Sequence, residues 1–421
     1  MRYLWLFLIY TIGLFATDKT LDIIKTIQKL PKIEVRYSID NDIDNDANYA
    51  LKLHEVLAND LKTSQHFDVS QNKDQGAINY AELKDKKVHL VALVSVAVEN
   101  GNKISRLKLY DVDTETLKKT FDYPIVSLDL YPFAAHNMAI VVNDYLKAPS
   151  IAWMKRLIVF SKYIGPGITN IALADYTMRY QKEIIKNNRL NIFPKWANAE
   201  QTEFYYTQYG ERTPMILKYN IQKATHENIA SSQGMAVVSS VSSDGSKILM
   251  SLAPDGQPDV YLYDTHKKTK TKITRYPGID VSGVFLEDDK SMAFVSDRSG
   301  YPNIYMKKLG LKESAEQLLY EGRSNESIDA YKDSIVYVSR ENLNEFGKTV
   351  FNLNLITLNS KYIRRLTVNG SNQMPRFSMD GRNIMYIKKT PQEYAMGLIL
   401  LDYNQSFLFP LKNVKIQAFD W

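Results

Sequence analysis

The side chains most often used in catalysis and metal binding are present, but their spacing matches no catalytic or metal-binding motif. The six histidines lie at positions 54, 66, 89, 136, 226 and 266. No pair of them fits His-Glu-x-x-His or a similar ligand spacing. The chain has no cysteine, which excludes disulfides, thiolate metal ligands and a cysteine nucleophile. It also lacks the Gly-x-Ser-x-Gly elbow of a serine hydrolase.

Acidic turns are the remaining candidates for a metal site. They are Ser243-Asp-Gly245, Glu287-Asp-Asp289, Met379-Asp-Gly381 and the longer stretch from Asn41 to Asp46. The three turns offer fewer carboxylates than a calcium ion requires, and Asp-Gly suits a tight turn without any metal. The stretch from Asn41 to Asp46 lacks the glycine and terminal glutamate of an EF-hand. We therefore expect no metal and no cofactor, and we interpret His136 as a packing histidine on an apolar-patterned helix.

Length, composition and charge indicate a folded protein without a nucleic-acid partner. The chain has 421 residues, with 45% hydrophobic and 24% charged residues, which is ordinary for globular proteins. Its net charge of +6 is dispersed along the chain, so it does not indicate nucleic-acid binding. The 28 tyrosines favour β-structure.

The first 16 residues resemble a secretory signal peptide. Arg2 provides the positive end, Tyr3 to Phe15 the apolar run and Ala16 a small residue at the end. Leu14 stands where a small residue is preferred, so the cleavage point could shift or the segment could persist as an anchor. No later stretch approaches the roughly 20 apolar residues that a membrane helix needs. We expect an exported protein with a signal peptide at 1–16.

Residues 17–149 show mixed helix and strand patterns. The predicted elements are a helix over Leu21–Leu30, a strand over Ile33–Ile39, a helix over Ala47–Leu61, strands over Val88–Val98 and Ser105–Val112, and a helix over Phe133–Leu146. This alternation predicts one N-terminal α/β domain.

Residues 150–421 contain an internal repeat. The repeated quartets are Phe193-Pro-Lys-Trp196, Val238-Ser-Ser-Val241, Ser282-Gly-Val-Phe285, Met374-Pro-Arg-Phe377 and Ile416-Gln-Ala-Phe419. They recur about every 44 residues with one double interval, and in three units an acidic turn and an apolar strand follow. Ser327–Ser339 fills the double interval, and Ala152–Tyr180 supplies a diverged first unit. Six units of four short strands predict a six-bladed β-propeller.

The chain ends at Lys415–Trp421, which is the beginning of a unit without its remainder. Such a strand can complete the first blade and close the ring. A β-sandwich or barrel is the alternative, but it would not place a turn at a fixed offset in each unit. The predicted fold class is therefore mixed: an N-terminal α/β domain, then an all-β six-bladed propeller closed by the C-terminal strand.

These motifs resemble the TolB family. The similarity is clearest in Phe294–Tyr305 and in the closing strand, and it extends to Ile33–Asp40, Ala58–Phe67 and Ala134–Leu146. The resemblance implies a monomeric periplasmic scaffold of the Tol–Pal system that supports outer-membrane integrity and cell division. It implies binding of the lipoprotein Pal at the channel mouth of the propeller, and of TolA through the N-terminal segment.

The resemblance and the repeat together suggest two contact regions. The loops before the innermost strands are the Pal-facing candidates: Ser232, Gln233, Met235, Arg275, Tyr276, Arg323, Asn325, Asn369 and Ser371. The TolA-type segment comprises Glu34, Val35, Arg36, Ile39 and Asp40, and here it is preceded by an additional helix-like stretch and followed by Asn41–Asp46. A propeller hydrolase or lactonase with a metal in the channel is the alternative, because channel carboxylates need no linear motif.

Overall fold

The computed structural model describes residues 30–39, 49–74, 76–210, 213–287, 289–310, 314–320, 322, 324–343, 348–390 and 394–421. The predicted signal peptide at 1–16, nearly all of the predicted helix over 21–30 and the acidic stretch at 41–46 lie outside the described residues. Across the described part of the chain, no helix is both long enough and apolar enough to span a membrane.

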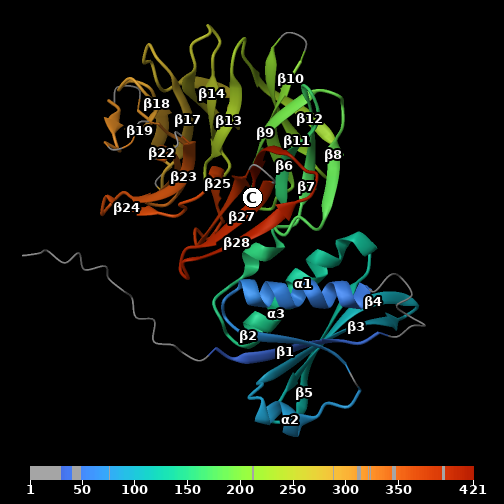
Figure 1. Ribbon diagram of the computed structural model, residues 1–421. Coiled ribbons are helices and arrows are strands. Elements are labelled where there is room, and N and C mark those ends of the chain that lie inside the picture. Colours follow the sequence, from blue (N-terminus) through green and yellow to red (C-terminus); the bar gives the residue numbers. More distant parts are fainter. Residues whose placement is uncertain are drawn as a thin grey trace, which may run out of the picture.

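The N-terminal part forms one mixed sheet. Its strands, in spatial order, are β2 (Asp68–Lys73), β1 (Lys32–Tyr37), β3 (Leu90–Glu99), β4 (Asn102–Asp111) and β5 (Thr116–Pro124). β1 runs parallel to both of its neighbours, and the other pairs are antiparallel. The helices are α1 (Tyr49–Thr63), α2 (Tyr80–Asp85) and α3 (Tyr131–Tyr145), and α1 and α3 lie between this sheet and the rest of the protein (Figure 1).

The strands and helices predicted for the described part of this region are confirmed within a few residues at their ends. β2, β5 and α2 were not predicted. Most side chains of β5 are exposed, so its sequence lacks the apolar alternation by which a half-buried strand is recognised.

The C-terminal part forms six units of four strands, which we call blades 1 to 6; blades 5 and 6 are joined into one sheet by the pairing of β23 with β25. Each blade is given from its innermost strand outward. Blade 1 consists of β29 (Ile416–Asp420), β6 (Ile158–Gly165), β7 (Ile168–Ala174) and β8 (Gln181–Ile185), and blade 2 of β9 (Leu190–Trp196), β10 (Glu203–Tyr209), β11 (Pro214–Asn220) and β12 (Thr225–Ser231). Blade 3 consists of β13 (Ala236–Val241), β14 (Lys247–Leu252), β15 (Asp259–Asp264) and β16 (Thr269–Lys272). Blade 4 consists of β17 (Asp280–Phe285), β18 (Ser291–Ser296), β19 (Asn303–Lys308) and β20 (Glu316–Gln317). Blade 5 consists of β21 (Asn325–Tyr331), β22 (Ser334–Leu343), β23 (Lys348–Thr357) and β24 (Tyr362–Arg365), and blade 6 of β25 (Ser371–Phe377), β26 (Asn383–Lys389), β27 (Tyr394–Leu400) and β28 (Gln405–Leu411).

The prediction that the C-terminal strand completes the first blade is confirmed, because β29 pairs with β6 of blade 1. The predicted first unit over Ala152–Tyr180 is shifted, however. Its first residues form a short 3-10 helix at Ala152–Lys155, and the strands of blade 1 begin only at Ile158.

Neighbouring blades are held together by separate apolar clusters. Blades 1 and 2, 2 and 3, 3 and 4, 4 and 5, and 5 and 6 each share one cluster of buried side chains. A further cluster joins Met385 and Met396 of blade 6 to Phe160 of blade 1. A single blade cannot cover both of its faces, so the stacking of blades supplies most of the burial.

The repeated quartets coincide with β-bulges in the innermost strands. Every innermost strand shifts register against the second strand of its blade. In four of them a non-glycine residue has a positive φ: Phe193 at 52°, Ser282 at 56°, Ser327 at 51° and Met374 at 52°. Such backbone is uncommon for L-residues, and a bulge bends the strand and redirects its side chains.

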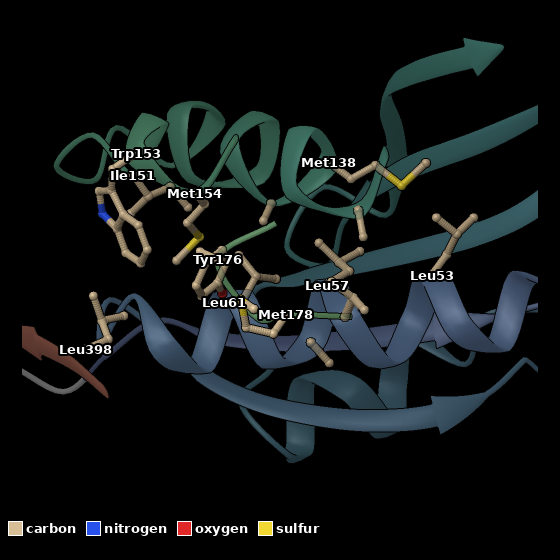
Figure 2. Close-up of a cluster of buried hydrophobic side chains, with 14 of the residues drawn as sticks. Leu53, Leu57, Leu61, Met138, Ile151, Trp153, Met154, Tyr176, Met178 and Leu398 are labelled. Atoms are coloured by element: carbon tan, nitrogen blue, oxygen red, sulfur yellow. The ribbon is translucent and has the colours of Figure 1, made fainter. Parts of the chain in front are cut away.

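The apolar cluster that joins blade 6 to blade 1 also covers the boundary between the N-terminal part and the propeller. Leu53, Leu57 and Leu61 follow one face of α1 at four-residue spacing. Figure 2 shows them packed with Trp153 of the connecting 3-10 helix and with Tyr176 from the loop after β7.

Candidate partner-binding site

The bulged innermost strands surround a central cavity of about 520 Å³. Its lining is largely apolar and includes Phe193 and Met374, both at bulge positions. At its rim, Met235 and Ile279 expose 38% and 46% of their surface. Large exposed apolar side chains that gather around a cavity are typical of a surface that another molecule covers.

The two ends of the propeller are not equivalent. Strands alternate in direction, so loops 232–235 and 275–279, which precede innermost strands, lie at one end of the blades. The N-terminal part contacts the other end: His136 lies 3.3 Å from Asp175 in the loop after β7, and the ring of His66 lies 5.7 Å from that of Tyr403 in the loop after β27. We call the end that carries loops 232–235 and 275–279 the free mouth.

Lys195, which lines the cavity, is paired with carboxylates of two other blades. Lys195 Nζ lies 2.8 Å from Asp420 Oδ1 and 3.9 Å from Asp329 Oδ1. Each carboxylate also accepts a hydrogen bond from the backbone N–H of an aromatic residue in the next blade, Asp420 from Trp196 at 2.9 Å and Asp329 from Phe377 at 2.8 Å. These two carboxylates hold blades together, so their oxygens already have partners inside the protein.

Among the described residues, no group of three His, Asp or Glu side chains could hold a metal ion. The Asp-Gly turns use their carboxylates locally. Asp244 accepts from Ser246 N at 2.9 Å and from Ser242 Oγ at 2.7 Å, and these bonds, with that from the Ser246 backbone the strongest, lower the pKa of Asp244 to about 2. Gly245 supplies the positive φ of 71° that the turn requires.

The loop before β17 is held in one conformation at the free mouth. Arg298 Nη2 lies 3.0 Å from both carboxylate oxygens of Asp280, and the guanidinium lies 5.0 Å from the ring centroid of Tyr276. Burial raises the pKa of Asp280 against the opposing effect of Ser296 and Arg298. At Gly278 a Cβ would collide with Asp297 and with the Tyr276 ring, so a larger residue would displace these side chains. This loop therefore presents its neighbouring side chains on a rigid base.

The structure separates the predicted Pal-facing residues into three groups. Gln233, Met235, Arg275 and Asn369 are exposed, Tyr276 and Ser371 are half-buried, and Ser232 and Asn325 are buried. Arg323 lies outside the described residues. Ser371 also bridges to Phe351, which joins blades 5 and 6.

Ser232 and Asn325 correct the prediction, because both side chains are used inside the protein. Ser232 Oγ accepts a hydrogen bond from Ala253 N at 3.0 Å, and Asn325 Nδ2 donates to Asn303 Oδ1 at 3.1 Å. They hold the loops rather than face a partner. Ile279 at the cavity rim was not among the predicted residues, although its place directly before an innermost strand was the available signal.

The predicted TolA-type segment lies mostly in the central strand β1. β2 and β3 occupy both edges of β1, and Glu34 and Val35 are 2% and 0% exposed. Arg36 Nε donates to Glu34 Oε1 at 2.6 Å. Glu34 and Val35 are therefore not accessible in the folded sheet, whereas Arg36 is half-buried. Ile39 follows the strand and is half-buried, and Asp40 lies outside the described residues.

His136 is buried, as predicted, but it is more than a packing residue. Its Nδ1 lies 2.7 Å from Asp60 Oδ2 of α1, and its Nε2 lies 3.3 Å from Asp175 Oδ2 of the propeller. It therefore joins the two parts of the molecule.

The architecture defines a β-propeller protein with an N-terminal α/β region, and comparison with known proteins identifies its family. The family profile described as "TolB beta propeller domain" matches residues 155–421. The chain is 98% identical over 421 residues to the Tol-Pal system protein TolB of Helicobacter pylori, covering 100% of both chains. It is 44% identical over 422 residues to the protein of the same name from Wolinella succinogenes, covering 100% of this chain and 99% of the relative.

The fold comparison agrees with the sequence comparison. The crystal structure of TolB from Acinetobacter baumannii superposes with a TM-score of 0.75 at 20% identity, covering 93% of this chain and 96% of the other. The chain therefore belongs to the TolB family of the Tol-Pal system. The relatives are named as a system component and not as an enzyme, and the resemblance inferred from the sequence motifs is confirmed.

Proposed function

We propose that this protein is a periplasmic binding scaffold of the Tol-Pal system that binds Pal at the free mouth of the propeller and thereby supports outer-membrane integrity and cell division. Membership of the TolB family and the name of the system support this role. The signal-like N-terminus supports export to the periplasm.

The observation that carries the proposal is the free mouth itself. Exposed Met235 and Ile279 stand at the rim of the cavity, and exposed Arg275 lies in the same rigid loop as Ile279. Apolar and arginine side chains at the centre of a surface are frequent binding anchors. The N-terminal part packs against the opposite end, so it leaves this surface accessible.

The test is calorimetric titration of the mature protein with the soluble domain of Pal. We expect Arg275→Glu and Met235→Asp each to weaken binding by at least about tenfold, as expected for a central contact residue. Lys267→Glu is the matched control, because Lys267 is an exposed cation of the hairpin between β15 and β16 at the opposite end. Unchanged affinity in both mouth variants would show that Pal binds elsewhere.

We also propose a contact with TolA at the end of β1, through Ile39 and Asp40. Both follow the strand along the chain, whereas Val35 is enclosed in the sheet. A contact that used Glu34, Val35 or Arg36 would require β1 to leave its place between β2 and β3.

A further inference from the structure

A second concave surface lies between blades 1 and 6, beside the pairing of β29 with β6. It is a wide groove of about 1230 Å³. Its lining residues come from three segments and are Tyr163–Gly167, Lys389, Thr390, Tyr394 and Leu411–Ile416. None of them is among the residues predicted from the sequence for partner binding.

The groove carries three positive charges that no carboxylate of the described residues balances. Lys412 and Lys415 are exposed, and Lys389 is half-buried. In the described part of the chain, none of the three ammonium groups forms an ion pair. Lys389 Nζ lies 5.5 Å from the ring centroid of Tyr394, and burial lowers the pKa of Lys389. A bound anion would relieve this uncompensated charge.

The groove also offers an apolar wall on a firm base. Tyr163 and Ile164 expose 46% and 51% of their surface, while Leu411 and Ile416 beneath are almost fully buried. Tyr163 N donates to Lys415 O at 2.9 Å, which continues the strand pairing to the edge of the groove. This bond fixes Tyr163 and Lys415 next to each other on the blade 1 side of the groove.

The groove opens at the same end of the propeller as the free mouth. Residues 412–415 precede the innermost strand β29, and residues 166–167 connect the second and third strands of blade 1. Loops of both kinds lie at the free mouth because the strands of each blade alternate in direction. A partner seated on the mouth can reach the groove without crossing the N-terminal part.

We propose that this groove binds an acidic segment of the partner protein, in which carboxylates meet Lys389, Lys412 and Lys415 and an apolar side chain packs on Tyr163 and Ile164. The proposal rests on the proposed function, since it places the segment in the protein that docks at the free mouth. A polypeptide is favoured over a nucleic acid or a lipid surface because the charges are lysines inside a concave, partly apolar groove rather than a broad basic face.

The test uses a fluorescein-labelled copolymer of glutamate and tyrosine as the probe and fluorescence anisotropy as the readout. We expect the mature protein to bind it, and the double variant Lys412→Glu/Lys415→Glu to bind it at least about tenfold more weakly. The matched control is Lys267→Glu/Lys361→Glu, which makes the same charge change on exposed hairpins at the opposite end. Tyr163→Ala, which removes the ring without adding a charge, should weaken binding of the copolymer but not of polyglutamate.

Each variant is first to be checked for folding by circular dichroism, and only folded variants are compared. Equal weakening in the control pair, or tighter binding of single-stranded DNA or phosphatidylglycerol vesicles than of the copolymer, would overturn the proposal. Failure of the groove proposal can be told apart from failure of the proposed function, because Arg275→Glu should weaken binding of Pal and leave binding of the copolymer unchanged. If the Arg275→Glu variant loses Pal while the groove variant keeps both ligands at full affinity, the groove assignment alone is wrong.

Discussion

The contact between the N-terminal part and the propeller includes one buried charged group beside its apolar cluster. His136 lies between Asp60 and Asp175, and all three side chains are fully buried. Burial disfavours the imidazolium, but the two carboxylates outweigh it and raise the pKa of His136 to about 9. Tyr176 completes the cluster by donating from its hydroxyl to Asp60 Oδ1 at 2.6 Å.

Replacing His136 with phenylalanine preserves a ring of similar size but removes the cation. Asp60 and Asp175 would then be buried near each other without a positive partner. Removing one member of a buried ion pair typically costs about 3–5 kcal/mol. Since whole proteins are stable by roughly 5–15 kcal/mol, this loss is a large fraction of the total.

The pH dependence of the unaltered protein provides an independent measure of the same cluster. The pKa of His136 is raised in the folded state, so its stabilising effect is fully present below the unfolded value of 6.5 and is lost as the pH rises through about 9. That interval corresponds to roughly 3 kcal/mol. Burial alone would raise the pKa of Asp175, but the hydrogen bond and the charge of His136 lower it. The contribution of Asp175 to the stability of the fold is therefore present above its unfolded pKa and is lost as the pH falls through the lowered folded pKa.

The assay is urea unfolding at pH 6.5, 7.5 and 9.5, followed by tryptophan fluorescence, to which Trp153 at the boundary contributes. His226→Phe is the control, because His226 is an exposed histidine of β12 whose contacts with Tyr206 and Tyr219 lie within blade 2. We expect His136→Phe to unfold at clearly lower urea at pH 6.5 and to lose most of the pH dependence above pH 7.5. Unfolding like that of the control, or an unaltered protein equally stable at pH 6.5 and 9.5, would refute this account of the cluster.

Two other predictions concern the chain ends. Deleting residues 416–421 removes β29 with its buried side chains and leaves β6 without its partner on that edge. We therefore expect no cooperative thermal transition by circular dichroism. Deleting Trp421 alone should lower the free energy of unfolding by about 3–5 kcal/mol. A wild-type melting curve for the longer deletion would contradict the role of β29. In a pull-down with TolA, Ile39→Asp should weaken binding about tenfold. The control Val126→Asp, at an 82% exposed position, should leave binding unchanged. Full retention of TolA by the Ile39 variant would exclude the proposed contact.

Much of the propeller could be predicted from the sequence because its information is local and repeated. Quartets such as Met374-Pro-Arg-Phe377 recur at one period, and each has the same place in its blade. The incomplete final unit predicted the pairing of β29 with β6 for the same reason. Where the local signal is weak, prediction was incomplete: the polar strand β5 was missed, and the start of blade 1 was placed too early.

The candidate site could be located by sequence only to the level of loops. Position before an innermost strand selected Met235 and Arg275, which are exposed, and equally Ser232 and Asn325, which are buried. The difference depends on partners such as Asn303, 22 residues away along the chain. Spacing along one segment contains no information on such contacts.

The sequence by itself determined the number and order of blades, most of the elements of the α/β part and the absence of cysteine chemistry, because these follow from composition and periodicity. Only the tertiary structure decided which side chains meet. The left-handed backbone at Phe193 is imposed by the bulge and not by a glycine. His136 meets Asp60 and Asp175, which lie 76 and 39 residues away, because the two parts of the molecule bury a shared surface. Burial and charge pairing act through space, so they become visible only after the chain has folded.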